Sequence, residues 1–139
     1  MIETLLLDAG REAEMLDAWR GKADAVLVDA PCSGTGTWRR NPEARWRLTP
    51  AQLARYVQTQ ANLLDVAAGL LRPSGRLVYV TCSLLDEEGA GQVDAFLARH
   101  PGWRADVASI PGGRLRGKGV RLTPSYDGTD GFFIAGLFR

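Results

Sequence analysis

Residues 23–36 read ADAVLVDAPCSGTG, and this stretch decides the fold class of the 139-residue chain. Its first part, residues 23–28, is a mostly apolar run of strand length, and the Asp-Ala-Pro that follows ends it. A helical pattern over residues 50–71 comes next, with Thr49-Pro50 as its N-cap and first position. After a Pro-Ser-Gly turn, residues 76–81 form a second apolar run. This strand–helix–strand order predicts an α/β protein with a mainly parallel sheet.

The same alternation continues on both sides of this unit. Residues 3–7 form a short apolar run that predicts a strand, and residues 11–19 have the pattern of a short helix. Ser83 begins a sequence similar to a capping box, which predicts a helix to about residue 99. Two last strands are predicted near residues 103–110 and 131–138. Apolar side chains of the final strand point to both faces, which is typical of an interior strand rather than an edge.

The composition is that of one globular domain. Hydrophobic residues make up 45% of the chain and charged residues 24%, and a domain of this length buries a core without disulfides or metals. No apolar stretch approaches the roughly 18–20 residues of a membrane span, and the first residues lack the pattern of a signal peptide. Two cysteines are too few for a disulfide framework. We therefore expect a cytoplasmic protein, and the membrane, collagen-like, disordered and disulfide-rich secreted classes are excluded.

Positive charge is concentrated in two stretches, although the whole chain carries only +1. Residues 38–47 contain four arginines and one glutamate, and residues 114–121 contain four cations and no acid. The rest of the chain is net negative, which predicts a basic face on an acidic body. Most of the basic residues are arginine, the side chain best suited to phosphate and to base stacking. A GC-rich genome would produce the same bias toward arginine without any function.

Cys32 and Cys82 occupy matching positions, each at the end of a predicted parallel strand. Neighbouring strands lie about 4.8 Å apart, and ligands of open α/β sheets bind at this carboxyl edge. Asp29 lies on the same rim, so two thiols and a carboxyl group would surround one cleft, an arrangement suited to covalent catalysis. The alternatives are that each cysteine is a small buried apolar residue, or that the two form a disulfide. Because the one histidine, His100, is predicted to cap a helix and there is no Cys-x-x-Cys pair, we expect no metal site.

The glycines of residues 33–37, Ser-Gly-Thr-Gly-Thr, follow a strand but do not match a cofactor loop. They lack the Gly-Lys-Ser/Thr of a P-loop and the spacing of a dinucleotide site. We expect glycine here to let a substrate approach the backbone closely.

Around these residues the sequence closely resembles the Sun family of RNA cytosine-5 methyltransferases. Residues 29–36, DAPCSGTG, with RRNP at 39–42, resemble motif IV of that family. Residues 60–64, QANLL, and 73–83, PSGRLVYVTCS, resemble the helix and the motif VI that follow. The sequence DGFFIA at 130–135 is similar to a C-terminal signature of the family. The motifs occur in the right order over nearly the whole chain, so the resemblance is specific.

The resemblance implies methylation of carbon 5 of cytosine in RNA, ribosomal or transfer, with S-adenosylmethionine as cofactor. It implies that Cys82 adds to carbon 6 of the ring, that Asp29 binds the ring edge, and that Cys32 assists loss of the carbon 5 proton. In DNA cytosine methyltransferases the motif IV cysteine is the nucleophile, so Cys32 is the rival assignment. For the cofactor, the resemblance implies contacts from Asp8, Asp29 and Pro31. The base must leave its stack to reach such a pocket.

The basic stretch after motif IV is the candidate RNA contact. Arg39, Arg40 and Arg45 would bind phosphates, and the rings of Trp38 and Trp46 would stack on bases. The alternative is a solvated loop whose tryptophans pack on the core.

The chain departs from the family pattern at its start. The cofactor loop that ends in Gly-Gly-Lys-Thr and the acidic residue after the second strand are absent, and no RNA-binding extension precedes the domain. By resemblance, residues 1–139 are a single partial methyltransferase domain, the C-terminal half of a Rossmann-like fold with an antiparallel last strand. Strand 23–28 would then have a free edge. We expect residues 3–7 to pair with it or with a second copy of the chain, which would make a homodimer.

Two other functions remain open from the sequence. The isolated chain is expected to be inactive as a fragment, and it would then act as a non-catalytic RNA-binding module or one completed by a partner. An exocyclic amino methyltransferase is the second rival, but residues 29–32, Asp-Ala-Pro-Cys, lack the second proline and the aromatic residue of its motif.

Overall fold

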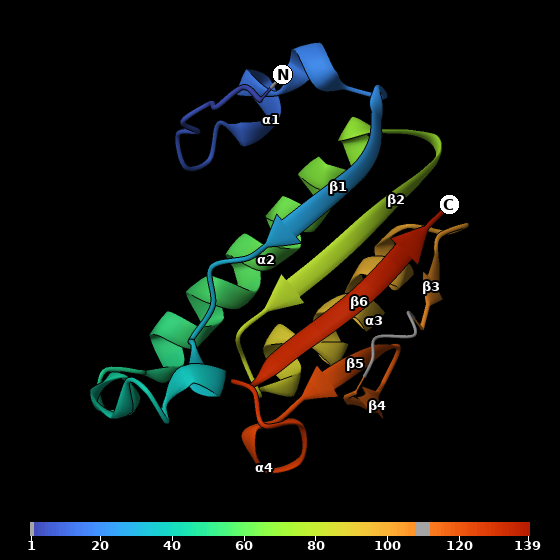
Figure 1. Ribbon diagram of the computed structural model, residues 1–139. Coiled ribbons are helices and arrows are strands. Elements are labelled where there is room, and N and C mark those ends of the chain that lie inside the picture. The colour runs from blue at the N-terminus through green and yellow to red at the C-terminus, as the bar shows by residue number, and fades with distance from the viewer. Residues whose placement is uncertain (1, 108–111) are drawn as a thin grey trace.

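The computed structural model describes residues 2–107 and 112–139, which form one six-stranded sheet with helices against it (Figure 1). Along the sheet the strands follow the order β1-β2-β6-β5-β4, and β3 pairs with β6 outside this path. In chain order the strands are β1 (Ala23–Asp29), β2 (Leu71–Thr81), β3 (Arg104–Asp106), β4 (Arg114–Arg116), β5 (Gly119–Leu122) and β6 (Phe132–Phe138).

The strand–helix–strand unit predicted from the sequence is present. Helix α2 (Pro50–Leu70) begins with a capping box, in which the Thr49 hydroxyl accepts from the Gln52 amide and the Gln52 side chain accepts from the Thr49 amide. The helix connects β1 to β2, which lie parallel with Asp29 opposite Val80. Strand β2 starts earlier than predicted, at Leu71, because an irregularity in the β1–β2 register accommodates the Pro-Ser-Gly turn within the strand.

Strand β6 lies inside the sheet, as its apolar pattern predicted. It runs antiparallel to β2 on one side and to β3 and β5 on the other. The prediction of a mainly parallel sheet is wrong for the described residues, because β1–β2 is the one parallel pairing and the other four are antiparallel. The reason is that β6 inserts, in the opposite direction, between β2 and β3. The α/β class and the antiparallel last strand are confirmed.

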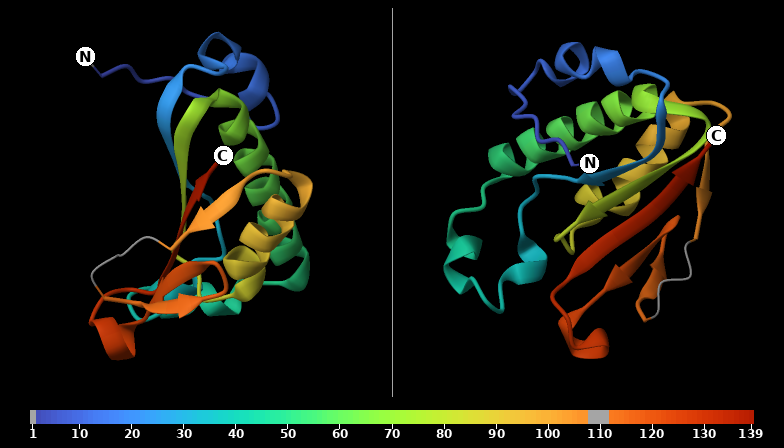
Figure 2. Two further views of the ribbon diagram at one scale, coloured as in Figure 1. Left: turned by 90° about the vertical axis from the view of Figure 1, so that its right-hand side faces the viewer. Right: turned by 45° about the horizontal axis from the view of Figure 1, so that its top comes forward.

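Helices α2 and α3 (Ala90–Arg99) lie on the same face of the sheet (Figure 2). The core lies between them and the strands, where Leu64, Phe96 and Phe133 are fully buried. Residues of β6 alternate between buried and half-buried, and the half-buried ones point to the face without these helices. Leu27 of β1, with 68% of its surface exposed, is part of the open end of the sheet.

The N-terminal segment differs from the prediction. Residues 3–7 form no strand and do not pair with β1, which has β2 as its one neighbour in the described sheet. Half of the predicted helix over 11–19 forms, as α1 (Glu12–Met15), and a 3-10 turn, η1 (Asp17–Trp19), follows it. Leu5 and Leu6 remain exposed. The outer edge of β1 therefore stays unpaired in the described sheet.

The helix predicted from Ser83 begins later. Residues Asp86–Glu88 form a 3-10 turn, η4, and α3 starts at Ala90 with Gly89 at its N-cap position. The Ser83 hydroxyl accepts from the Leu85 amide, two residues on, so it caps a local turn instead of α3. At the other end His100 terminates α3 as predicted: its amide donates to Phe96 and its ring lies 2.8 Å from Asp65.

Short elements between β2 and β6 were not all foreseen. Strand β3 is shorter than the predicted strand over 103–110, of which residues 108–110 lie outside the described residues. The basic stretch 114–121 is a hairpin of β4 and β5, and a turn of helix, α4 (Pro124–Asp127), leads to β6. Two 3-10 turns, η2 (Thr35–Thr37) and η3 (Pro42–Trp46), shape the long loop after β1.

Among the described helices, none combines the length and the hydrophobicity that a membrane crossing requires.

Candidate active site

The two cysteines meet at the carboxyl edge of the sheet, as the topology predicted. Cys82 directly follows β2, and Cys32 lies three residues beyond the end of the parallel strand β1. Their Sγ atoms are 3.4 Å apart, both thiols are free, and both residues are half-buried. The pair is therefore neither a disulfide nor two separate buried apolar residues. Asp29, at the end of β1, is exposed on the same rim.

The two thiols differ in acidity. The hydrogen bond from Cys32 lowers the pKa of Cys82 to about 7, against burial and the negative charges of Asp29 and Glu88, which raise it. The same hydrogen bond, together with burial, raises the pKa of Cys32. A thiolate is the nucleophilic form of cysteine. Near neutral pH the pair therefore holds a thiolate on Cys82 that accepts a hydrogen bond from the Cys32 thiol.

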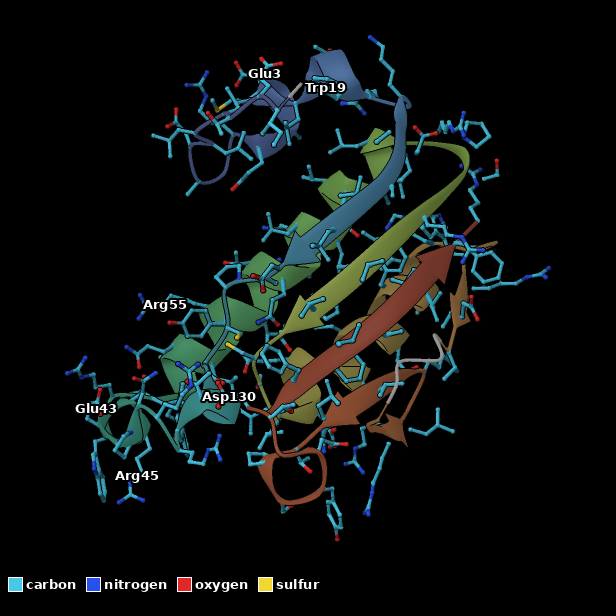
Figure 3. All side chains as sticks on the ribbon, viewed as in Figure 1. Glu3, Trp19, Glu43, Arg45, Arg55 and Asp130 are labelled. Carbon is cyan, nitrogen blue, oxygen red and sulfur yellow. The ribbon has the colours of Figure 1, made fainter. Side chains whose placement is uncertain are left out.

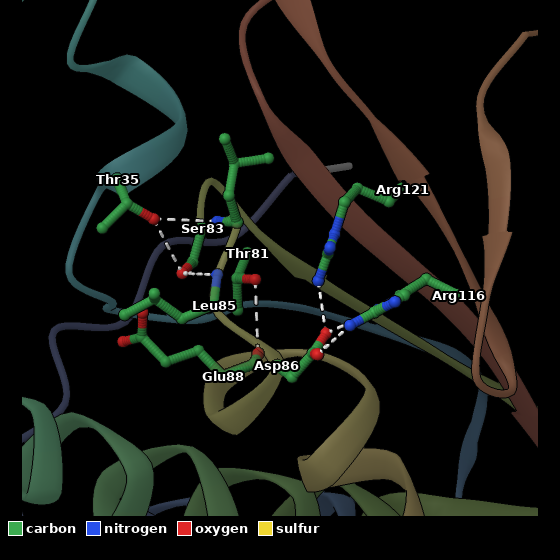
Figure 4. Close-up of polar contacts among 9 residues, drawn as sticks. Thr35, Thr81, Ser83, Leu85, Asp86, Glu88, Arg116 and Arg121 are labelled. Atoms are coloured by element: carbon green, nitrogen blue, oxygen red, sulfur yellow. Dashed lines mark hydrogen bonds and ion pairs between the residues drawn. The ribbon is translucent and has the colours of Figure 1, made fainter.

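A network of buried polar groups supports the loop that carries Cys32 (Figure 4). Glu88 is fully buried and accepts from the Ser33 amide at 2.8 Å and the Ser33 hydroxyl at 2.5 Å. Ser83 lies 3.1 Å from the Thr35 hydroxyl, which in turn accepts from the Leu84 amide at 2.8 Å. Buried polar groups are costly unless they are paired. The network thus holds the loops after β1 and β2 together.

The glycine-containing loop has a different role from the one predicted. The Gly36 amide donates to the Cys82 carbonyl at 3.0 Å, and the Gly131 amide donates to the Gly36 carbonyl at 2.8 Å. Glycine at position 36 thus lets the backbone before β6 approach closely. At Gly36 the expectation that glycine serves the approach of a substrate is wrong, because the space next to its Cα is filled by Gly131.

The predicted RNA-binding arginines fall into two groups (Figure 3). Arg40 pairs with Asp130, its Nε at 2.6 Å and its Nη2 at 2.5 Å from Oδ2, and Arg39 lies 3.9 Å from the same carboxylate. Arg45 instead points away from the body, and its guanidinium lies 4.5 Å from the ring centroid of Trp46.

The two tryptophans of this stretch differ as well. Trp46 is 77% exposed. Trp38 is half-buried, and its buried indole N–H has no hydrogen-bond partner among the described residues. Trp46 therefore presents an open ring, whereas Trp38 packs partly against the protein.

The hairpin that carries the second basic stretch uses its cations internally. Arg116 and Arg121 both pair with Asp86 of η4, four residues after Cys82 (Figure 4). Lys118 lies 3.0 Å from Asp94, and the Arg114 guanidinium stacks 3.3 Å from the ring centroid of Tyr126. These contacts join the hairpin to the segment after Cys82.

The residues predicted to hold the cofactor lie near one cleft. Asp29 lines a cleft of about 230 Å³ with Leu7, and α2 supplies much of its apolar wall. Pro31 is exposed close to Asp29. Asp8 follows Leu7 but is not among the lining residues, and its carboxylate lies 3.6 Å from Arg11. The structure thus brings Asp29 and the segment of Asp8 to the same region.

No group of three or more metal-ligating side chains gathers in residues 2–107 and 112–139.

Comparison with known proteins decides the family. A family model for the 16S rRNA methyltransferase RsmB/F matches residues 4–138, almost the whole chain. The chain belongs to the RsmB/F family. This membership confirms the resemblance to the Sun family that the motifs predicted.

Relatives within the RsmB/F family extend well beyond this chain. The ribosomal RNA small subunit methyltransferase B of Thermus thermophilus is 49% identical over 119 residues, which are 85% of this chain and 30% of that protein. The protein of the same name from Erwinia tasmaniensis is 40% identical over 124 residues, 88% of this chain and 28% of that protein. The chain thus spans less than a third of these relatives.

A solved structure confirms the Rossmann-like methyltransferase fold of the RsmB/F chain. NSun6 from Pyrococcus horikoshii, determined with SFG, superposes with a TM-score of 0.82 at 30% sequence identity. The match covers 98% of this chain and 34% of that one.

Several residues of the RsmB/F site were missed by sequence reasoning. Glu88 and Gln60 are fully buried beside the cysteine loop, and Asp86 joins the hairpin to the segment after Cys82. The three acids at 86–88 fall where the sequence predicts the first turn of the helix that begins near Ser83. Gln60 falls within a helix stretch that resembled the family, and a glutamine between apolar neighbours was the one signal available for it.

Proposed function

We propose that this chain carries the cysteine-bearing half of an S-adenosylmethionine-dependent RNA cytosine-5 methyltransferase, which modifies ribosomal or transfer RNA through a covalent adduct with Cys82. The observation that carries the proposal is the 3.4 Å contact between Cys82 and Cys32 at the sheet edge where Asp29 also lies. Family membership supports the same reaction class.

Cytosine carbon 5 is a poor nucleophile, and a thiolate on Cys82 overcomes this. Its sulfur forms a bond to carbon 6, and the electron pair of the 5,6 double bond moves to carbon 5, which then takes the methyl group. Loss of the carbon 5 proton to solvent, which Cys32 assists, returns the electron pair to the double bond, and the bond from Cys82 to carbon 6 breaks. Asp29 binds the ring edge at nitrogen 3 and the amine, where it stabilises the adduct.

Cys82 is the better nucleophile of the two on physical grounds. The Cys32 thiol donates the hydrogen bond and its pKa is raised, so it stays protonated while Cys82 ionises. A pKa of about 7 places Cys82 near the optimum for attack at neutral pH. This polarity argues against the rival assignment to Cys32.

S-adenosylmethionine supplies the electrophilic methyl group when it is bound. The apolar cleft beside Asp29 fits one side of such a ligand, since a carboxylate at the end of a parallel strand is placed to accept from ribose or amine donors. We assign Asp29 and Pro31 to this wall and Asp8 to its margin. The family neighbour NSun6 was determined with SFG, an analogue of this cofactor.

RNA is the proposed partner of the loop after β1. Arg45 and the open ring of Trp46 are suited to a phosphate and a stacked base. Arg39 and Arg40 remain candidates through the exposed parts of their side chains, while their pairing with Asp130 makes them positioners of the loop. Trp38, half-buried, would contribute a ring edge at most.

Residues 1–139 are proposed to be one partial methyltransferase domain that works in the cytoplasm. The helices cover one face of the sheet, and the chain spans under a third of its curated relatives. We propose that the chain alone is inactive and that a second face is needed to complete the site. The alternative is a non-catalytic RNA-binding or partner-completed module, which would bind RNA tightly and show methyl transfer only when the missing N-terminal half is added.

The decisive test is an adduct with RNA that contains 5-azacytosine, followed on denaturing gels with the chain completed by the missing N-terminal half. Cys82→Ser should abolish the adduct, and Cys32→Ser should let it accumulate. The reverse result would move the nucleophile role to Cys32. Calorimetric titration of S-adenosylmethionine into the chain tests the cofactor wall separately. A radiolabelled methyl group found on the exocyclic amine instead of carbon 5 would revive the amino methyltransferase.

A further inference from the structure

Glu88 is a fully buried acid beneath the cysteine pair, and the proposed reaction makes no use of it. It lies in η4, six residues after Cys82. Its Oε1 accepts from the Ser33 amide at 2.8 Å and from Gln60 Nε2 at 3.1 Å, and its Oε2 accepts from the Ser33 hydroxyl at 2.5 Å. Burying a carboxyl group is expensive, and such a site persists only where its hydrogen bonds are complete.

The partners of Glu88 come from three separate parts of the fold. Ser33 directly follows Cys32, and Gln60 of α2 also donates to the carbonyl of Pro31, which precedes Cys32, at 3.0 Å. On the other side, the Tyr79 hydroxyl donates to the Glu88 carbonyl at 2.8 Å and ties the turn to β2. The residues before and after Cys32 are thus both held, while Cys82 is fixed by the end of β2.

We propose that Glu88 is a positioning residue for the cysteine pair: its carboxylate holds Ser33 so that the Cys32 thiol is aimed at Cys82 Sγ. The meaning of this alignment for catalysis rests on the proposed function, but the alignment itself does not. Glu88 contacts no reacting atom and acts through Ser33.

The charge of Glu88 and its hydrogen bonds have opposite effects on the pKa of Cys82. The groups that act electrostatically on the thiols are Asp29 from β1, Arg40 after η2, and Glu88. Tyr79 of β2 also faces this region, but burial raises its pKa and keeps it neutral. The negative charge of Glu88 disfavours a thiolate on Cys82, whereas the Cys32 alignment that it maintains favours one. Loss of the Glu88 contacts is therefore expected to raise the pKa of Cys82, and loss of the Glu88 charge is expected to lower it.

Two substitutions separate these effects. Glu88→Asp keeps the charge but is one methylene too short to reach Ser33, and Glu88→Gln keeps the length and removes the charge. The rate of alkylation of Cys82 by iodoacetamide is measured against pH in the 139-residue chain, by mass spectrometry of the peptide that contains it. Glu87→Gln, at an exposed acid in the same turn, is the matched control.

We expect E88D to raise the midpoint of Cys82 alkylation toward the ordinary thiol value of about 8.5, with a fall in rate at pH 7 of up to about fifteen-fold. E88Q should leave the midpoint unchanged or lower it, and E87Q should match the unsubstituted chain. If Glu88 contributed to packing alone, its substitution would lower the melting temperature, and the Cys82 alkylation midpoint of each variant would equal that of the unsubstituted chain.

Three results would overturn the proposal. They are an unchanged midpoint in folded E88D, an equal rise in E88D and E88Q, or a midpoint near 8.5 in the unsubstituted chain. If E88D does not fold, Ser33→Ala decides, because it removes the hydroxyl contacts to Glu88 and Ser83 and keeps the amide contact to Glu88. A raised midpoint supports the proposal and an unchanged one ends it. Failure of the adduct assay would leave these midpoints untouched, so the two proposals are tested separately.

Discussion

Gly36 and Gly131 lie so close that a Cβ atom on Gly36 would be 2.1 Å from the carbonyl oxygen of Gly131. Both positions belong to sequence motifs that lie almost a hundred residues apart, one after β1 and one before β6. The contact gives a structural reason for the presence of both motifs: their backbones pack directly against each other next to the segment of Cys82. Since the Gly36 amide also donates to the Cys82 carbonyl, the contact links the segment before β6 to the backbone of Cys82.

Gly36→Ala should destabilise the chain by about 1–3 kcal/mol, because the new methyl group meets backbone that has no room to move. Urea unfolding measures this loss. The matched control is Gly69→Ala in the last turn of α2, where the nearest atom would be 4.0 Å away, and where alanine should stabilise by up to about 1 kcal/mol. Equal effects of both substitutions would contradict the proposed close approach.

Cys32→Ala should make Cys82 less reactive at neutral pH. The hydrogen bond from Cys32 is the main cause that lowers the pKa of Cys82 to about 7, so its loss should raise the midpoint of alkylation toward about 8.5. Alkylation rates between pH 5 and 10 check this. A midpoint that stays near 7 would mean that a group other than Cys32 lowers the pKa of Cys82.

The elements that the sequence predicted well are those with local signals. Thr49 and Pro50 mark the start of α2, and the apolar runs of β1, β2 and β6 have no competing helical pattern. The meeting of Cys32 and Cys82 followed from topology alone, because parallel neighbours end at the same edge.

What was missed depends on partners distant in sequence. Strand β4 is exposed throughout, so its residues show none of the apolar alternation that signals a strand. Glu88 reads as a surface acid, and only the arrival of Ser33 and Gln60 makes its burial possible. Residues 3–7 have the apolar pattern of a strand, but they pair with no strand of the described sheet.

Asp86→Asn should lower the free energy of unfolding at neutral pH, but not in strong acid. Hydrogen bonds from Arg116, and then from Arg121, lower the pKa of Asp86 to about 2 in the folded chain, against about 3.9 when unfolded. The stabilisation is therefore complete above about pH 5 and is lost as the pH falls toward 2. Because the side chain is 46% exposed, solvent screening limits the effect to about 1 kcal/mol.

Unfolding free energies of D86N and the unsubstituted chain should thus differ at pH 7 and converge near pH 2. Glu87→Gln in the same turn is the control and should follow the unsubstituted chain. A constant difference between D86N and the unsubstituted chain at every pH would show that the ion pairs do not stabilise the hairpin contact.

Trp46→Ala should weaken RNA binding with little change in stability, since the ring is 77% exposed and a stacked base contributes about 1–3 kcal/mol. Arg45→Ala should reduce the dependence of binding on salt by about one phosphate contact. Fluorescence anisotropy with a short single-stranded RNA measures both. Trp19→Ala, at the opposite end of the molecule (Figure 3), is the control. An equal loss in all three variants would argue against this surface.

Leu27→Lys should reduce self-association of the isolated chain. Strand β1 ends the described sheet with unpaired backbone groups, and Leu27 exposes 68% of its surface there. Such an edge invites pairing with another strand, and a charged side chain opposes it. With residues 3–7 not paired with β1, we expect a second copy of the chain to pair with it in the absence of further protein.

Sedimentation velocity over a range of concentrations should show a dimer that L27K shifts to monomer. Leu115→Lys, an equally exposed leucine on β4 at the other end of the sheet, should leave the dimer intact. A chain that is monomeric at every concentration, or a dimer that only L115K disrupts, would exclude β1 as the contact.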